Sequence, residues 1–285
     1  MATYLITQTL NGLFSAALLF LIASGLTLAF GVMRIVNIAH GSFYMLGVYV
    51  AYSVILQTGS LLLGALAAML VVGSLGFVMQ RFFLRRFGSD PLPQMMMTMG
   101  FALLFRDGAL MIWGGDPFTL PYPPGLSGSM EAGDVVFPLY RLFVIVVAGL
   151  VGLSLWMVNE KTLVGARLRA TVDDPEMASA TGINVAVLSS AVFAAGAALA
   201  AFGGVMGGPI LGGYAGIDFD LLPLAFVVVI VGGMGSLKGA VVGSIVVGMI
   251  DNFGKALVPE LSYFTLFAPM VLVLALRPTG LYGRA

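Results

Sequence analysis

The long uncharged stretches of the sequence constrain its fold more than any other feature. No charged residue occurs from Met1 to Met33, and between Arg34 and Arg81 the uncharged run is interrupted only by His40. A helix rises ~1.5 Å per residue and the hydrocarbon core of a bilayer is ~30 Å thick, so one crossing takes ~20 apolar residues. The first stretch is therefore long enough for one membrane crossing. The second is long enough for two, with a turn near residues 57–60.

The composition excludes most other classes of protein. Hydrophobic residues make up 60% of the chain and charged residues only 9%, whereas a soluble domain carries about 25% charged residues. The 13 basic residues balance the 13 acidic ones, so no charge excess favours nucleic acid. With no cysteine and a single histidine, we expect neither a metal site nor a hydrolytic triad.

The later crossings follow from hydropathy. They are predicted at residues 91–113, 138–158, 186–207, 221–234, 237–257 and 262–276. The total is eight or nine transmembrane helices, depending on whether residues 221–257 cross twice. The sequence thus predicts an all-α polytopic membrane protein with a single domain over residues 1–285.

Basic residues indicate the orientation of the chain, because Lys and Arg accumulate in cytoplasmic loops. With the N-terminus outside, one face receives Arg34, Arg81, Arg85, Arg86, Lys161, Arg167, Arg169, Lys238, Arg277 and Arg284. The other face keeps Arg141 and Lys255. We therefore expect a cytoplasmic C-terminus, an external loop at 114–137 and a second external loop at 208–220. The start of the chain lacks a basic signal-peptide region, so the first span is expected to remain in the mature protein.

The polar loop at 159–184 is predicted to contain a short amphipathic helix. Asp173 or Asp174 can cap this helix, Pro175 suits its first turn, Glu176 complements its dipole, and Gly182 ends it. Its acidic residues would be repelled by anionic headgroups, which favours docking into a protein groove over lying on the bilayer.

Four segments of the sequence resemble one family. These are GLTLAFGVMRIVNIAHGSFYMLGVY (25–49), KTLVGARLRATVDDPEMASATG (161–182), VVGGMGSLKGAVVGSIVVGMIDN (229–252) and the RPTGLYG ending (277–283). They resemble the membrane-spanning permeases of branched-chain amino-acid ABC importers, and together they cover nearly the whole chain.

The resemblance implies a type II-like permease that works by alternating access in a bacterial inner membrane. It also implies partners: a second permease subunit, usually a different one, two cytoplasmic ATPase subunits and an extracytoplasmic solute-binding protein. Relatives carry branched-chain and other amino acids, urea and short amides, or aromatic acids, so the substrate stays open.

The resemblance also implies an ATPase-docking surface in the loop at 159–184. It consists of Arg167, Arg169, Asp173, Asp174, Glu176, Ala178 and Gly182. The alternative is that this loop is only a solvated connection.

The chain has no phosphate-binding loop of its own. The closest run, GMGSLKG at 233–239, has glycine after Lys238 where magnesium binding needs a hydroxyl residue. We therefore expect no cofactor in this chain, with ATP and Mg²⁺ bound by the partner subunits.

Arg34, Asn37 and His40 are candidates for the translocation path. Their spacing of i, i+3 and i+6 would place them on one face if the segment is helical. Gly31 and Gly41 bracket the segment, and a helix broken there would expose backbone that only a protein-lined or wet cavity could satisfy. The alternative is an interfacial anchor at Arg34, with hydrogen bonds from the other two to a neighbouring helix.

Charged residues in the fourth predicted span are a second set of path candidates. Arg106 and Asp107 lie near its middle, where an unpaired charge is costly. Neighbouring side chains on a helix point about 100° apart, so we expect each to face polar partners inside the bundle, on the path or in a bridge to Asp251 and Asn252. A third possibility is a shorter span with the pair near the outer surface.

Two further groups of residues complete the sequence-based expectations. Tyr214, Asp218 and Asp220 on the outer loop are candidates for contact with the binding protein. The alternative is that they are simply solvated.

Small residues recur every four positions at 196, 200 and 204 and at 235, 239 and 243. This spacing predicts tight helix packing more than a seam that slides during a transport cycle.

The rival function is a proton-coupled secondary carrier. It would use Arg106, Asp107, Asp251 and His40 as a relay and would need no ATPase. A carrier does not require the inner loop, and this chain has few intramembrane carboxylates. A membrane enzyme is less favoured still, because no nucleophile, base and orienting group can be assembled.

Overall fold

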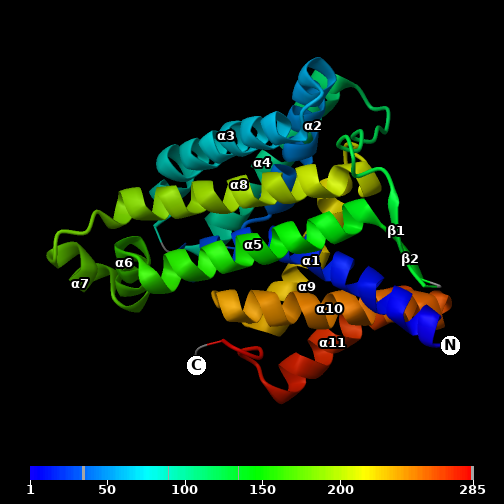
Figure 1. The fold of residues 1–285 in the computed structure, drawn as a ribbon. Helices are drawn as coiled ribbons and strands as arrows, with labels where there is room; N and C mark the ends of the chain where they lie inside the picture. Colours follow the sequence, from blue (N-terminus) through cyan, green and yellow to red (C-terminus); the bar gives the residue numbers. More distant parts are fainter. Residues whose placement is uncertain (34–35, 89, 134, 284–285) are drawn as a thin grey trace.

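The computed structural model describes residues 1–33, 36–88, 90–133 and 135–283, which form a bundle of long helices (Figure 1). Its elements are α1 (Ala2–Met33), α2 (His40–Thr58), α3 (Leu61–Val78), η1 (Met79–Phe83), η2 (Leu84–Phe87), α4 (Pro91–Trp113), β1 (Ser129–Ala132), β2 (Val135–Pro138), α5 (Leu139–Lys161), α6 (Leu163–Asp173), α7 (Pro175–Ala180), α8 (Val185–Leu211), α9 (Ile217–Gly232), α10 (Leu237–Leu257), η3 (Pro259–Leu261) and α11 (Ser262–Leu276).

Six of these helices are long and apolar enough to cross a membrane within the described ranges. They cover residues 3–33, 61–87, 91–113, 139–161, 185–211 and 237–257. The remaining predicted crossings correspond to α2, α9 and α11, of 19, 16 and 15 residues. The segment expected to cross once or twice, residues 221–257, contains two helices, α9 and α10, separated by a turn. The loop expected at 208–220 is shorter than predicted, because α8 continues to Leu211 and α9 begins at Ile217.

Local capping explains where the helices begin and end. Gly59 ends α2 with φ 66°, and its amide donates to the carbonyl of Ile55 at 2.8 Å. The hydroxyl of Ser60 then accepts from the amide of Leu63 to start α3. The turn expected at residues 57–60 is confirmed.

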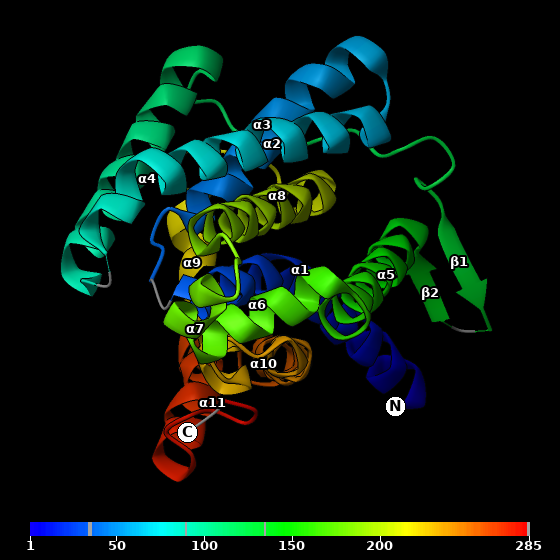
Figure 2. The same cartoon turned by 90° about the vertical axis from the view of Figure 1, so that its left-hand side faces the viewer.

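The centre of the bundle consists of α1 and α8, which pack on each other and together contact most of the other helices. In Figure 2, α1 lies near the middle, whereas α4 lies at the margin. Close approach depends on glycine: a Cβ at Gly25 would lie 2.3 Å from the carbonyl oxygen of Gly196, and one at Gly204 would lie 2.3 Å from that of Tyr44. The prediction of tight packing at the 196–204 repeat is confirmed.

The bundle has two distinct ends, visible in Figure 1. One end carries α6, α7 and the C-terminal segment, and we call it the α6–α7 end. The other carries the N-terminus and the β1–β2 hairpin, and we call it the hairpin end. The helix α10 runs between them, so Lys238 lies at the α6–α7 end and Lys255 at the hairpin end.

The hairpin departs from the all-α expectation. Residues 114–137 were expected to be a loop, but β1 and β2 pair antiparallel there, with Ser129 opposite Pro138 and Ala132 opposite Val135. The run Val135–Val136–Phe137 has high strand propensity, and Phe137 is buried, which gives the second strand a reason to form.

Candidate translocation path and coupling surface

The helix α2 begins inside the bundle rather than at its end. The His40 ring, in the first turn of α2, lies 2.9 Å from the carbonyl oxygen of Ile22 through Nε2. Ile22 lies about three turns, or ~16 Å, before the end of α1. The first turn of α2 therefore lies beside the middle part of α1 rather than beside its C-terminal end.

The helix α9 begins against the start of α2. A Cβ on Gly41 would lie 2.3 Å from the carbonyl oxygen of Asp218, so the two backbones touch. The Ser42 hydroxyl donates to Asp218 Oδ2 at 2.8 Å. We call this contact, with the segments 36–43 and 216–220, the α2–α9 junction. Between Gly31 and Gly41, α1 ends at Met33 and α2 begins at His40, so the two are separate helices.

Several buried polar atoms at the α2–α9 junction have no hydrogen-bond partner in the described part of the chain. They are both amide atoms of Asn37, Oδ1 of Asp218 and Nε of Arg106. Asn37 is 1% exposed and Asp218 2% exposed. Unpaired atoms at this burial are uncommon in folded proteins and call for an explanation.

Asn37 and His40 do not form the helical face that their spacing suggested. Asn37 precedes the first turn of α2, whose N-cap is Ala39. The neighbouring amide of Ile38 donates to the Thr98 hydroxyl on α4 at 3.2 Å. Arg34, the third member of the set, lies outside the described residues.

Arg106 and Asp107 point in different directions from α4. The Arg106 guanidinium lies 6.0 Å from the centre of the Phe219 ring, beside the α2–α9 junction. Asp107, in contrast, is exposed on the outer side of α4. The expectation that both face polar partners inside this subunit is wrong for Asp107, because α4 packs mainly against α2 and leaves its other side uncovered.

Asn252 lies far from the α2–α9 junction, near the hairpin end. Its amide donates to the backbone oxygen of Gln8 at 2.8 Å and to the side-chain oxygen of the same residue at 2.9 Å. These bonds link α10 to α1. Asp251 pairs with Lys255 one turn along α10, at 2.7 Å, so neither residue bridges to Arg106.

The four residues of the carrier relay are separate in the structure. Within the described ranges, no hydrogen bond or ion pair joins any two of Arg106, Asp107, Asp251 and His40.

The predicted cap of the helix at the α6–α7 end is present. The Asp174 carboxylate accepts from the amides of Glu176 and Met177, both at 3.0 Å. Pro175 occupies the first turn, and Gly182 follows the helix with φ 90°. A difference is that residues 159–184 contain two helices, α6 and α7, where a single one was expected.

The expected docking residues divide into two groups. Arg167, Asp173, Asp174, Glu176 and Gly182 are exposed. Ala178, on the buried side of α7, is only 3% exposed. Arg169 is partly buried and donates to the backbone oxygen of Asn159. The Arg169 bond ties α6 to the end of α5, and α7 contacts α6 and α8. Met177, which was not singled out as a docking residue, has 62% of its surface exposed.

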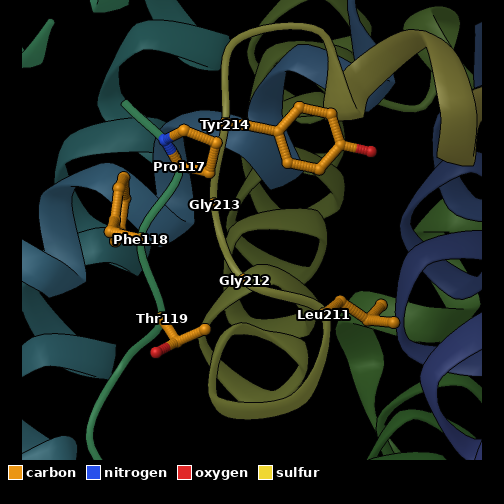
Figure 3. Close-up of a pocket in the computed structure, with 7 residues that line it drawn as sticks. All are labelled: Pro117, Phe118, Thr119, Leu211, Gly212, Gly213 and Tyr214. Carbon is orange, nitrogen blue, oxygen red and sulfur yellow. The ribbon is translucent and has the colours of Figure 1, made fainter. Parts of the chain in front are cut away.

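A hollow of about 280 Å³ opens at the hairpin end, between residues 117–119 and 211–214 (Figure 3). The two segments are joined by a reciprocal backbone pair between Phe118 and Gly213, at 3.0 and 2.7 Å. This pairing brings the two loops that were expected outside onto one face.

The three outer-loop candidates do not form one group. The Tyr214 hydroxyl donates to Asp220 at 2.5 Å, and this bond, with partial burial, raises the pKa of Tyr214 to about 12. Asp218 belongs instead to the α2–α9 junction. Sequence reasoning missed that role because Ser42 and Asp218 are 176 residues apart. The only local sequence signal for this contact was Gly41, which is followed by Ser42 in a mostly apolar span.

Comparisons with known proteins agree with the family suggested by the sequence. The family model described as branched-chain amino acid transport system / permease component matches residues 8–274. The branched-chain permease BraD of Pseudomonas aeruginosa is 29% identical over 97% of this chain and 95% of its own length. LivH of Escherichia coli K12, described in the same way, is 29% identical over 99% of this chain and 96% of its own.

One solved structure has a similar fold. PsaBC from Streptococcus pneumoniae in complex with Fab superposes with a TM-score of 0.51 at 14% identity, covering 95% of this chain and 92% of the matched one.

Proposed function

Because the chain belongs to the family of branched-chain amino acid transport permeases, we propose that it forms one half of the path through which an ATP-driven importer moves amino acids by alternating access. Members of this family are transport subunits of ABC systems in the inner membrane, and separate ATPase subunits hydrolyse the ATP. The observation that carries the proposal is the family match over residues 8–274, together with an intact, capped α7.

We propose that the α6–α7 end is cytoplasmic. Together with the helix ends that lie beside them, its elements carry most of the basic residues of the described chain: Arg81, Arg85, Arg86, Lys161, Arg167, Arg169, Lys238 and Arg277. The hairpin end has Arg141 and Lys255. This asymmetry is the positive-inside pattern. The N-terminus would then lie outside and the C-terminus inside, and the short interior helices α2 and α9 are compatible with a type II-like arrangement.

We propose that α7 transmits the movement of an ATPase subunit to the bundle. Met177 offers an exposed apolar side chain beside the acidic Glu176, which suits an apolar groove with a basic rim on the partner. The Arg169 bond ties α6 to the end of α5, and α7 contacts α8, so a push on α7 reaches α8 directly. ATP and Mg²⁺ would be bound by the two ATPase subunits.

The outer side of α4 supports a second permease subunit as partner. Met111 is 87% exposed and Leu104 62% exposed, Gly100 and Gly108 have open space around them, and Asp107 lies on the same side of the helix. A carboxylate inside an apolar span costs ~2.5–3.5 kcal/mol when it faces lipid. Glycines favour helix contact, so a polar group of a neighbouring permease is the better partner for this side of α4.

The hairpin end would receive the extracytoplasmic solute-binding protein. The hollow between 117–119 and 211–214 lies on this face, and its lining includes Tyr214, which precedes the start of α9 by three residues. Its volume of about 280 Å³ falls just below the usual size range of ligand pockets, which suits brief passage more than tight storage.

The substrate is tested by reconstitution. The chain would be purified with its co-expressed partners, placed in proteoliposomes with ATP on the side of the ATPase subunits, and assayed with labelled leucine, urea and benzoate. Uptake of leucine with exclusion of the other two supports the amino-acid assignment. Uptake of urea or benzoate instead would retain the importer and replace its substrate.

A further inference from the structure

The unpaired polar atoms of the described chain are concentrated at one place. Nine buried side-chain atoms lack a partner, and four of them, on Asn37, Asp218 and Arg106, flank the α2–α9 junction. A buried atom that gives up water without gaining a partner is destabilising. A ligand that supplies the missing partners would account for retaining such atoms in the middle of the bundle.

The two helices that meet there also begin without a capping side chain. Among the described helices, α3, α4, α6, α7, α8 and α10 each have a side chain that accepts from a first-turn amide. The N-caps of α2 and α9 are Ala39 and Gly216, and neither provides that bond. The N-caps of α5 and α11, Pro138 and Leu261, do not provide it either. The first-turn amides of His40, Ile217 and Phe219 donate instead to the backbone oxygens of Asn37, Tyr214 and Gly216. The N-terminal ends of both helices still carry partial positive charge, which favours anionic groups.

The unpaired atoms at the junction include both a hydrogen-bond acceptor and a hydrogen-bond donor. Asp218 offers an acceptor, Oδ1, beside the Oδ2 already bonded to Ser42. Arg106 offers a donor, Nε, above the Phe219 ring. Within the described ranges the two side chains form no ion pair at 4.0 Å or less, so each charge remains available to a third group.

We propose that the α2–α9 junction binds the charged ends of an α-amino acid as it crosses the membrane, with Asp218 accepting from its ammonium group and Arg106 donating to its carboxylate. Asn37 supplies one further donor and one further acceptor from its amide. This inference rests on the proposed transport function and names the chemistry of the substrate that the path recognises.

An apolar surface lies beside these charges. Phe105 and Phe219 are both partly exposed, and the Phe105 ring lies 6.0 Å from that of the buried Phe43. A hydrophobic side chain on the substrate would contact this surface. Urea, in contrast, lacks both charges, and benzoate lacks the ammonium group. In the conformation described here the polar atoms are buried, so substrate reaches them when α2 and α9 separate.

The test is leucine binding to the purified complex of the chain with its partners, in nanodiscs, without nucleotide and without the solute-binding protein. Hydrogen exchange would be followed in peptides covering residues 36–43 and 216–220 during a leucine titration. Leucine should slow exchange in both peptides. Leucinamide, which lacks the carboxylate, and 4-methylpentanoate, which lacks the ammonium group, should each have at least a ~10-fold higher midpoint, as expected for loss of one charge-assisted hydrogen bond.

Two variants separate a binding role from a structural one. Asp218→Asn keeps an oxygen for Ser42 but removes the charge, and it should raise the leucine midpoint ~10-fold or more while leaving the weaker midpoint of 4-methylpentanoate unchanged. The matched control is Asp251→Asn, because Asp251 is also buried, with one bonded oxygen and one unpaired oxygen. That control should leave every midpoint unchanged.

The proposal is overturned if leucine gives no protection at residues 36–43 and 216–220, or if Asp218→Asn weakens both leucine and 4-methylpentanoate equally. The same preparation is assayed for ATP-driven uptake. Uptake by a wild-type complex that shows no protection at the junction contradicts this inference alone. Absence of ATP-driven uptake of any compound contradicts the proposed function itself.

Discussion

The Ser42 hydroxyl donates a 2.8 Å hydrogen bond to the carboxylate of Asp218, which ties the first turn of α2 to the first turn of α9. Ser42 is fully buried and Asp218 is 2% exposed. The bond is charge-assisted and shielded from water, which makes it stronger than a bond between neutral groups at the surface.

Replacing Ser42 by alanine should therefore destabilise the bundle. The Asp218 carboxylate would lose its side-chain donor, at a cost of ~1–3 kcal/mol. The measurement is thermal unfolding of the purified chain in detergent. Ser24→Ala is the control, because Ser24 is equally buried but bonds only the Leu21 carbonyl of its own helix. Equal losses from the two substitutions would contradict the importance of the α2–α9 bond.

A methyl group at Gly25 should disrupt the contact between α1 and α8. Its Cβ would lie 2.3 Å from the carbonyl oxygen of Gly196, and a backbone atom cannot move aside as a side chain can. We expect Gly25→Ala to cost ~1–3 kcal/mol or more, seen as a lower unfolding temperature. Gly149→Ala on α5, with open space around it, should be neutral or stabilising because alanine favours helix by ~1 kcal/mol.

Much of this architecture could be predicted from local sequence. Hydropathy predicted α4, α10 and α11 to the residue, and the signals for caps and turns predicted Gly59–Ser60 and the Asp174–Pro175 start of α7. These features depend on residues close together in the chain. The repeat at 196–204 predicted close packing because small residues at a spacing of four need no knowledge of the partner helix.

The interior starts of α2 and α9 could not be predicted in the same way. Ser42 and Asp218 lie 176 residues apart, and no periodicity connects them. Asp218 and Asp220 look equivalent in sequence, yet one is buried against α2 and the other is exposed beside Tyr214. Asp107 was expected in the bundle interior because a charge in a membrane span usually faces protein. In the structure it lies on the exposed side of α4. The hairpin at 129–138 depends on short strands that hydropathy does not separate from a loop.

Loss of the α7 cap should uncouple ATP hydrolysis from transport. Asp174→Ala removes the acceptor for two amides and should cost ~1 kcal/mol of local stability. We expect ATP-driven uptake to fall while insertion in the membrane is retained. Asp90→Ala is the matched control, because Asp90 caps α4 at the same end of the bundle by accepting from the Leu92 amide. If the two variants lose uptake equally, α7 has no special role.

The outer side of α4 should crosslink to a second permease subunit. The chain has no cysteine, so Met111→Cys introduces a single thiol at a site that is 87% exposed. A bifunctional thiol reagent with a cysteine scan of the partner subunit should give one crosslinked heterodimer. Leu70→Cys on α3, with 72% of its surface exposed in the free chain, serves as the lipid-facing control. Crosslinking at position 70 but not at 111 would assign the interface to α3 instead.

The energy source for uptake tests the central claim most directly. Labelled leucine uptake would be measured in proteoliposomes containing the chain, its partners and the solute-binding protein, first with ATP and no ion gradient, then with a pH gradient and no ATP. An importer permease should transport only with ATP. A Glu176→Lys, Gly182→Trp variant, with one exposed change on α7 and one just after it, should lose that uptake while remaining inserted. Uptake driven by the pH gradient without ATP would contradict the account and favour the carrier.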